Sequence, residues 1–305
     1  MEDCPLLYDE YIEEGKGRYA MKKLLLFLLV LVGLYFIGSS IKEASWFPFG
    51  RGDSHTQSIK QIDLLDIKVD SSNTTIIPED REDVKTELEG KGKLDVDRRG
   101  DIIRIEVKRK WFQNFGFWNK SKLTVRVPQE YDRDMNVTIG SGKLTMEGPS
   151  KKDPMKLKKM NVNMGSGKLD LENLDVKQYK HNGSSGMANL TSISTQTGEI
   201  KMTSGIVNVD GYEGKLDATL SSGKLNVQMD KLEDSVDVHV SSGLVKLDLP
   251  DNADFTLKGK VSSGDISCDF PLESQEVGNH KVNGKHGSGK HTIDVTVSSG
   301  KVNIY

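Results

Sequence analysis

A short motif, Ser-Ser-Gly or a close variant followed by a strand-like run, recurs through the C-terminal half of this 305-residue chain. From Gly142 to Gly264 the motif glycines recur at intervals of 18 to 25 residues, which is in the range typical of solenoids and other repeat arrays. The spacing predicts a chain that turns at the same place on each circuit. The predicted turn glycines are Gly142, Gly167, Gly186, Gly205, Gly223, Gly243, Gly264 and Gly300.

The residues that follow each glycine alternate between apolar and mainly polar. The second and fourth are always apolar, as Leu225 and Val227 are after Gly223, although apolar residues make up only 35% of the chain. Alternation with a period of two indicates strands with one buried face. Glycine suits the sharp turn because it reaches positive φ without steric cost. The repeat therefore predicts an all-β solenoid with coils of roughly 20 residues, each holding two or three short strands.

An apolar run near the N-terminus predicts one transmembrane helix. Lys22 and Lys23 precede the run, and residues 21–41 include a stretch just long enough to span a bilayer. Basic residues before the span predict a cytoplasmic N-terminus and an extracytoplasmic remainder. A signal peptide cleaved at residues 38–40 is the alternative. Residues 1–20 are either a cytoplasmic tail or an untranslated extension upstream of a true start at Met21.

Aromatic residues gather at two places, beside the predicted span and in residues 109–120. Rings next to the span favour the membrane interface, and the basic rim of the second group suits anionic headgroups. A local aromatic cluster that covers one end of the core is the alternative. The candidate membrane or partner contacts are Trp46, Phe47, Phe49, Trp111, Phe112, Phe115, Phe117 and Trp118.

After the anchor we expect a juxtamembrane linker at 42–58, an N-terminal β-strand part of the ectodomain at 59–140 and the Ser-Gly-repeat solenoid at 141–305. Within 59–140, the alternating runs 103–107 and 123–127 are predicted to flank a long hairpin. A turn is predicted at residues 71–73, with Asn73 in the role of glycine.

Several kinds of chemistry find no support in the sequence. A net charge of -3 gives no basis for nucleic-acid binding, and two cysteines exclude a disulfide framework or a zinc cluster. Residues 284–291 resemble a phosphate-binding loop, but a strand rather than a helix follows them. Three histidines in that region, His280, His286 and His291, lack further ligands in a known metal-binding pattern. We therefore predict no catalytic, metal or cofactor site.

Three further features lead to expectations about the repeat. Cys268 alternates with apolar neighbours and is expected to be buried and unreactive. The chain ends in a strand at 302–305, which predicts an open solenoid end covered by residues 278–291 or by a partner. Four lysines share one turn position and form either a basic ladder for an anionic wall polymer or a solvated face. They are Lys143, Lys168, Lys224 and Lys301.

The repeated Ser-Gly-Lys/Asp-Leu/Ile strand, the lead-in strands and the N-terminal anchor together resemble the DUF4097 "putative adhesin" family of β-strand repeat proteins. The likeness is greatest to its LiaG-type members from Gram-positive envelope-stress operons, and it covers about residues 59–305 plus the anchor. The shared motif is a structural turn and brings no catalytic residues with it. The resemblance implies an extracytoplasmic β-helix that faces the wall of a Gram-positive bacterium.

These observations predict a non-enzymatic, single-pass protein of the cell membrane that acts in the cell envelope through protein partners in a stress response. An adhesin or binding module for cell-wall or surface polysaccharide is the alternative, and polysaccharide cleavage is a third hypothesis. No cofactor and no nucleic acid are expected, and the oligomeric state is left open.

Overall fold

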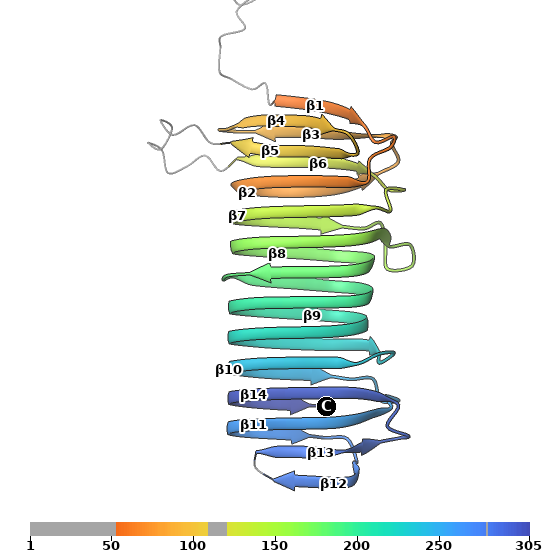
Figure 1. The fold of residues 1–305 in the computed structure, drawn as a ribbon, viewed down its shortest axis with the longest axis vertical. Coiled ribbons are helices and arrows are strands. Elements are labelled where there is room, and N and C mark those ends of the chain that lie inside the picture. Colours follow the sequence, from red (N-terminus) through yellow and green to blue (C-terminus); the bar gives the residue numbers. More distant parts are fainter. Residues whose placement is uncertain (1–52, 109–120, 279) are drawn as a thin grey trace, which may run out of the picture. The chain divides into compact units, whose positions relative to one another are not determined.

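In a computed structural model that describes residues 53–108, 121–278 and 280–305, the elements are all β-strands, stacked in coils (Figure 1). Long strands bend at the glycine corners, so one strand can hold more than one coil. The coil-forming strands are β2 (Leu64–Glu79), β7 (Asp134–Glu147), β8 (Met155–Gly183), β9 (Met187–Lys231), β10 (Val236–Asp248), β11 (Phe255–Cys268) and β14 (His291–Ile304). The shorter strands are β1 (Asp53–Ser58), β3 (Asp83–Glu89), β4 (Lys93–Arg99), β5 (Ile102–Lys108), β6 (Lys122–Pro128), β12 (Glu273–Gly278) and β13 (Lys281–His286).

Each coil consists of two arms joined at a corner. In β10 the first arm is residues 236–240, the corner is 241–243 and the second arm is 244–248. β10 pairs in parallel with β9, and the corner glycines Gly243 and Gly223 are register partners. The same corner-to-corner register joins β7 to β8. Equivalent residues of successive coils therefore stack in columns along the solenoid.

The corners bring the backbones of successive coils into close contact. All eight predicted turn glycines have positive φ, between 118° and 147°. A Cβ on Gly223 would lie 1.9 Å from the carbonyl oxygen of Gly205, and a Cβ on Gly243 would lie 1.8 Å from that of Gly223. The corner thus requires glycine for two reasons. Its backbone conformation has positive φ, and there is no space for a Cβ against the preceding coil.

Apolar side chains from both arms fill the interior. The second and fourth residues after each turn glycine are buried, except for Cys268, which is half-buried. The expectation of full burial for Cys268 is therefore wrong. Within β11 only residues 255–260 pair with β13, so among the described strands the second arm of that coil has β14 as its one neighbour. The burial that remains still raises the pKa of the Cys268 thiol.

The N-terminal end of the solenoid includes a coil whose two arms are separate strands. β5 pairs in parallel with residues 64–69 of β2, and β6 pairs in parallel with residues 73–79. β5 and β6 are therefore two arms of one coil, and the predicted hairpin between them is wrong, because alternation alone cannot distinguish the two arrangements. The predicted role of Asn73 is also wrong, since Ser72 is the register partner of Gly142.

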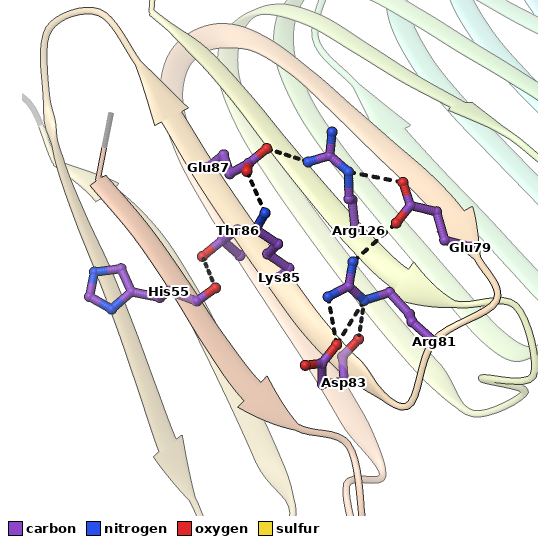
Figure 2. A network of polar contacts seen from close by, with 8 residues as sticks. All are labelled: His55, Glu79, Arg81, Asp83, Lys85, Thr86, Glu87 and Arg126. Carbon is purple, nitrogen blue, oxygen red and sulfur yellow. Dashed lines mark hydrogen bonds and ion pairs between the residues drawn. The ribbon is translucent and has the colours of Figure 1, made fainter. Parts of the chain in front are cut away.

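An ion-pair network crosses the outer face of β2, β6 and β3 (Figure 2). Arg126 contacts Glu79 at 2.9 Å and also pairs with Glu87, while Lys85 approaches Glu87 at 2.8 Å. Arg81 joins the network through Glu79 at 3.0 Å. The contacts from Lys85 and then Arg126 lower the pKa of Glu87. Each of these charges has a partner of opposite sign, so the network fastens the end strands.

The C-terminal strand lies between two earlier strands. β14 pairs in parallel with β10 on one side and with β11 on the other (Figure 1). The last coil is therefore β11, and the antiparallel hairpin of β13 and β12 covers its first arm. The expectation that residues 302–305 form an open end is wrong, because Val302 and Ile304 are fully buried.

The glycine-rich loop before β14 wraps around a carboxylate of its own chain. Asp254, immediately before β11, accepts a hydrogen bond from Ser288 Oγ at 2.6 Å and one from the Lys290 amide at 3.0 Å. These bonds, that of Ser288 first, lower the pKa of Asp254. The loop that resembles a phosphate-binding loop thus binds Asp254 and fixes the start of β14 beside β11.

Replacing Asp254 with asparagine is expected to loosen β14. The two hydrogen bonds from Ser288 and Lys290 to Asp254, here called the Asp254 clamp, depend on an ionised carboxylate with a lowered pKa. The clamp is therefore present at neutral pH and is lost as the pH falls through that pKa. Amide hydrogen exchange in residues 291–297 should accelerate in the variant. Asp251→Asn, at an exposed carboxylate in the same connection, is the control and should leave the exchange unchanged. Equal exchange in both variants would contradict the clamp.

Residues 52–305 form one compact unit, and the division at 140/141 stays a prediction. None of the residues from 53 onward that the structure describes belongs to a helix long and apolar enough to cross a membrane. The predicted span at 21–41 lies outside the described residues.

Candidate binding surface

A shallow groove runs along the outer face of the first arms, beside the corners. It has a volume of about 580 Å³ and is lined by residues of five consecutive coils. Its outward lining consists of two columns, one two residues before the corner glycine and one four residues before it, and the inward residues Ile139, Met164, Gly183 and Met202 lie between them. The columns are Gly140, Gly165, Ser184, Thr203 and Ser221, and Thr138, Asn163, Asn182, Lys201 and Thr219.

The groove is hollow where the column contains glycine. A Cβ on Gly165 would lie 2.3 Å from the carbonyl oxygen of Gly140, and one on Gly140 would lie 2.4 Å from that of Asp70. Close stacking of the coils therefore excludes side chains from the floor at these positions. The neighbouring column contributes hydroxyl and amide groups as one wall.

Two asparagines give the groove its main hydrogen-bonding groups. Asn182 Nδ2 donates to Asn163 Oδ1 at 3.0 Å. A carboxamide has two N–H donors and an oxygen that accepts two bonds, so the pair retains free donors and acceptors after this contact. Among the described lining residues Lys201 is the one charged side chain, and it pairs with Glu199. The outward columns are therefore polar and close to neutral, while Ile139, Met164 and Met202 line the groove from the inward positions between them.

A second groove, of about 510 Å³, lies on the outer face of the second arms. Its central column is a ladder in which Asn208 donates to Asn189 at 2.9 Å and Asn189 to Asp170 at 2.7 Å. Asn226 continues the ladder beyond the groove and donates to Asn208 at 2.7 Å. Burial of Asp170 opposes its ionisation, but the bond from Asn189 and the ion pair with Lys143 outweigh this and lower its pKa. The polar groups here mostly satisfy one another across the coils.

One buried histidine interrupts the apolar interior behind the first groove. His181 is fully buried, in register with Ile200, and neither ring nitrogen has a hydrogen-bond partner in the described structure. Its Nε2 would lie 3.0 Å from a Cβ on Gly183, so the imidazole packs over the space that this glycine leaves. Burial lowers the pKa of His181 to about 4.

The sequence-predicted contact residues beside the span and in the aromatic segment lie outside the described residues. β5 ends at Lys108 and β6 begins at Lys122, and their partners in β2 flank its corner. The turn glycines lie together as one column along the solenoid edge.

The predicted lysine ladder is divided by ion pairing and by the order of the coils. Lys143 and Lys168 both contact Asp170, at 2.9 and 3.0 Å. Lys301 stacks between Leu244 and Asp265, since β14 lies between β10 and β11. These lysines therefore lie on a solvent-exposed face of mixed charge and do not form a continuous basic surface.

The histidine-rich segment takes part in the C-terminal cap. The His286 ring lies 5.0 Å from the Phe270 ring, and its Nδ1 is 3.0 Å from the carbonyl oxygen of Pro271. Within 53–108, 121–278 and 280–305 no group of three or more histidine, cysteine or acidic residues could hold a metal ion.

The sequence did not single out Asn163, Asn182 or His181. The two asparagines occupy outward strand positions, where any polar residue is compatible with the fold. His181 had a visible signal, because it stands at an inward position that is apolar in the next coil.

Solved structures from three bacteria are similar to this chain at low identity. One from Clostridium sporogenes, described as a "putative cell adhesion protein", is 12% identical over 83% of this chain and 98% of that chain, with a TM-score of 0.31. A "putative lipid binding protein" from Parabacteroides distasonis is 15% identical over 84% and 98%, with a TM-score of 0.41. A "putative adhesin" from Bacteroides fragilis is 13% identical over 84% and 99%, with a TM-score of 0.32. With identities and TM-scores this low, these likenesses support no functional conclusion.

No curated protein matches this chain. A family model described as Toastrack DUF4097 matches residues 62–305, which include every strand from β2 to β14. The resemblance read from the Ser-Gly repeat is thereby confirmed at the level of the family, while the LiaG-type likeness stays a prediction. This protein belongs to the Toastrack DUF4097 family.

Proposed function

We propose that this protein is a non-enzymatic binding module of the cell envelope, and that the groove on its first arms binds an extended, uncharged polysaccharide. In this proposal residues 21–41 anchor it in the membrane of a Gram-positive bacterium, with the N-terminus in the cytoplasm and the solenoid outside. The observation that carries the proposal is the pair of outward columns in the groove lining, to which five consecutive coils contribute amides, hydroxyls, glycines and Lys201.

The chemistry of the lining favours a neutral glycan over a charged polymer. Sugar hydroxyls both donate and accept, and so do the carboxamides of Asn163 and Asn182 and the hydroxyls of Thr203 and Ser221. Lys201 is the one charge in the lining and is neutralised by Glu199. Coils repeat every 4.7–4.9 Å in the hydrogen-bonding direction, and a sugar unit in an extended glycan advances by a comparable distance. A glycan along the solenoid axis can therefore meet the same groups coil after coil.

The role in envelope stress through protein partners, which the family resemblance implies, stays a prediction. Its candidate contacts lie in the segments outside the described residues. Crosslinking from intact membranes followed by mass spectrometry would identify such partners, and it does not depend on the groove.

Removing the two groove amides is expected to weaken glycan binding. Each lost hydrogen bond costs about 0.5–1.5 kcal/mol, so Asn163→Ala with Asn182→Ala should lower affinity by roughly tenfold or more. Residues 53–305 would be screened against neutral and anionic oligosaccharides, and the tightest neutral ligand would then be measured by calorimetry.

The same arms supply a matched control outside the groove. Asn161 Nδ2 donates to Asn136 Oδ1 at 2.7 Å, which reproduces the amide pair one column away. Asn136→Ala with Asn161→Ala should leave affinity unchanged. Binding of anionic glycans alone, or equal affinity in the two double variants, would overturn the assignment of the groove.

A further inference from the structure

The position of β14 defines a strand-sized space between β10 and β11, here called the slot. β10 and β11 are consecutive in the chain, yet β14 separates them (Figure 1). Val245 of β10 and Ile266 of β11 are both register partners of Val302. The flanking strands thus present equivalent edges to the strand between them, and the last strand of the chain fills the space that the chain itself left open.

The slot admits only a strand with this protein's own motif. A Cβ on Gly300 would lie 1.8 Å from the carbonyl oxygen of Gly243, and a Cβ on Gly264 would lie 1.8 Å from that of Gly300. An occupant therefore needs glycine at the corner and apolar residues at the second and fourth positions after it, where Val302 and Ile304 are fully buried. β14 of a second copy meets these requirements by identity.

We propose that the slot between β10 and β11 accepts β14 from a second copy of this chain, so that two molecules join by strand exchange. Exchange reproduces in the dimer every contact that β14 makes with β10 and β11, so its equilibrium cost is small. β14 is also synthesised after β10 and β11, so these two strands are available before their partner is. In that interval the β14 of a neighbour competes with the molecule's own.

The connection to β14 is suited to act as the hinge. Residues 287–290 join β13 to β14 and include Gly287 and Gly289, both with positive φ. The loop is held by Asp254 through Ser288 and Lys290. Releasing these bonds frees β14 while the hairpin of β12 and β13 stays on β11 through its own pairing.

Disulfide trapping between full-length chains tests the exchange. Two single-cysteine variants, Lys246→Cys and Asn303→Cys, would be made with Cys4 and Cys268 replaced by serine. Lys246 and Asn303 are register partners across the slot, and neighbouring strands hold Cα atoms within disulfide reach. The two proteins are mixed, opened in urea below the unfolding midpoint, diluted and mildly oxidised. The expected result is a shift from monomer to dimer mass on non-reducing gels.

A second pair on the same strands provides the register control. His239 and Thr296 are also partners across the slot, so His239→Cys with Thr296→Cys should form the dimer too. The mixed combinations, 246 with 296 and 239 with 303, place the thiols on different arms and should not. A single chain carrying both Lys246→Cys and Asn303→Cys should close internally, which verifies the register.

Internal closure of that chain without in-register dimers after opening would overturn the proposal. So would dimers that form equally in all four combinations, since these would report random collision. Failure of the double variant to close internally would show that β14 does not occupy the slot.

Discussion

Replacing Gly223 with alanine is expected to lower the free energy of unfolding by about 3–5 kcal/mol, from strained backbone and overpacking together. The residue has φ of 134°, which L side chains rarely adopt. Its new Cβ would also lie 1.9 Å from the carbonyl oxygen of Gly205, and that oxygen belongs to a corner fixed by the coil beneath. The collision therefore cannot be relieved by rotating a side chain. Urea unfolding followed by circular dichroism measures the loss.

Two other glycines separate the contributions to this loss. Gly100 has φ of 61° with nothing near its missing Cβ, so Gly100→Ala should cost only the backbone strain, about 1 kcal/mol. Gly278 also has open space around it, and its φ lies outside the strained region, so Gly278→Ala should change stability little. If Gly223→Ala cost no more than Gly100→Ala, close stacking at the corner would not be what requires glycine.

Acidification is expected to destabilise the protein through His181. The pKa of this residue is lowered from 6.5 to about 4 because its ring is buried without a partner. Above pH 6.5 both the folded and unfolded states hold a neutral imidazole. As the pH falls from 6.5 to 4 the unfolded chain binds the proton and the folded chain does not, so stability declines. The loss approaches roughly 3 kcal/mol and then levels off.

His181→Leu isolates this contribution from that of the carboxylates. Leucine is apolar like Ile200, its register partner, and it removes the buried unpartnered nitrogens. We expect the variant to be at least as stable as the parent at pH 7.5 and to lose the decline between pH 6.5 and 4. His55→Gln, at an exposed histidine of β1, should show the same decline in stability between pH 6.5 and 4 as the parent. An unchanged decline in His181→Leu would show that other groups titrate in this window.

The proposed groove illustrates how the repeat can serve binding. Inward residues and corner glycines are constrained by stacking, whereas outward residues such as Asn163 and Thr203 are free to vary without affecting the core. Outward residues at equivalent positions of successive coils are separated by the distance between coils. This division places the binding chemistry on the face that the repeat leaves unconstrained.

Misreadings from the sequence concern the order in which strands pair. The runs that become β5 and β6 alternate like a hairpin, but they belong to one coil because each pairs with a different arm of β2. The strand at 302–305 comes last in the chain, but it lies inside the stack. Both errors have one origin. Alternation reports which face of a strand is buried and carries no information about which strand lies beside it.

The sequence by itself determined the architecture of a single coil. Glycine at the corner and apolar residues two and four positions later were sufficient, because positive φ and period-two burial are local properties. The tertiary structure decided which coil stacks on which. Every coil offers nearly the same corner and the same edges, so strand order depends on the length of the connections and on caps such as the Asp254 clamp. Because the corners and edges of the coils are so similar, β14 can pair between β10 and β11 although it follows both in the chain.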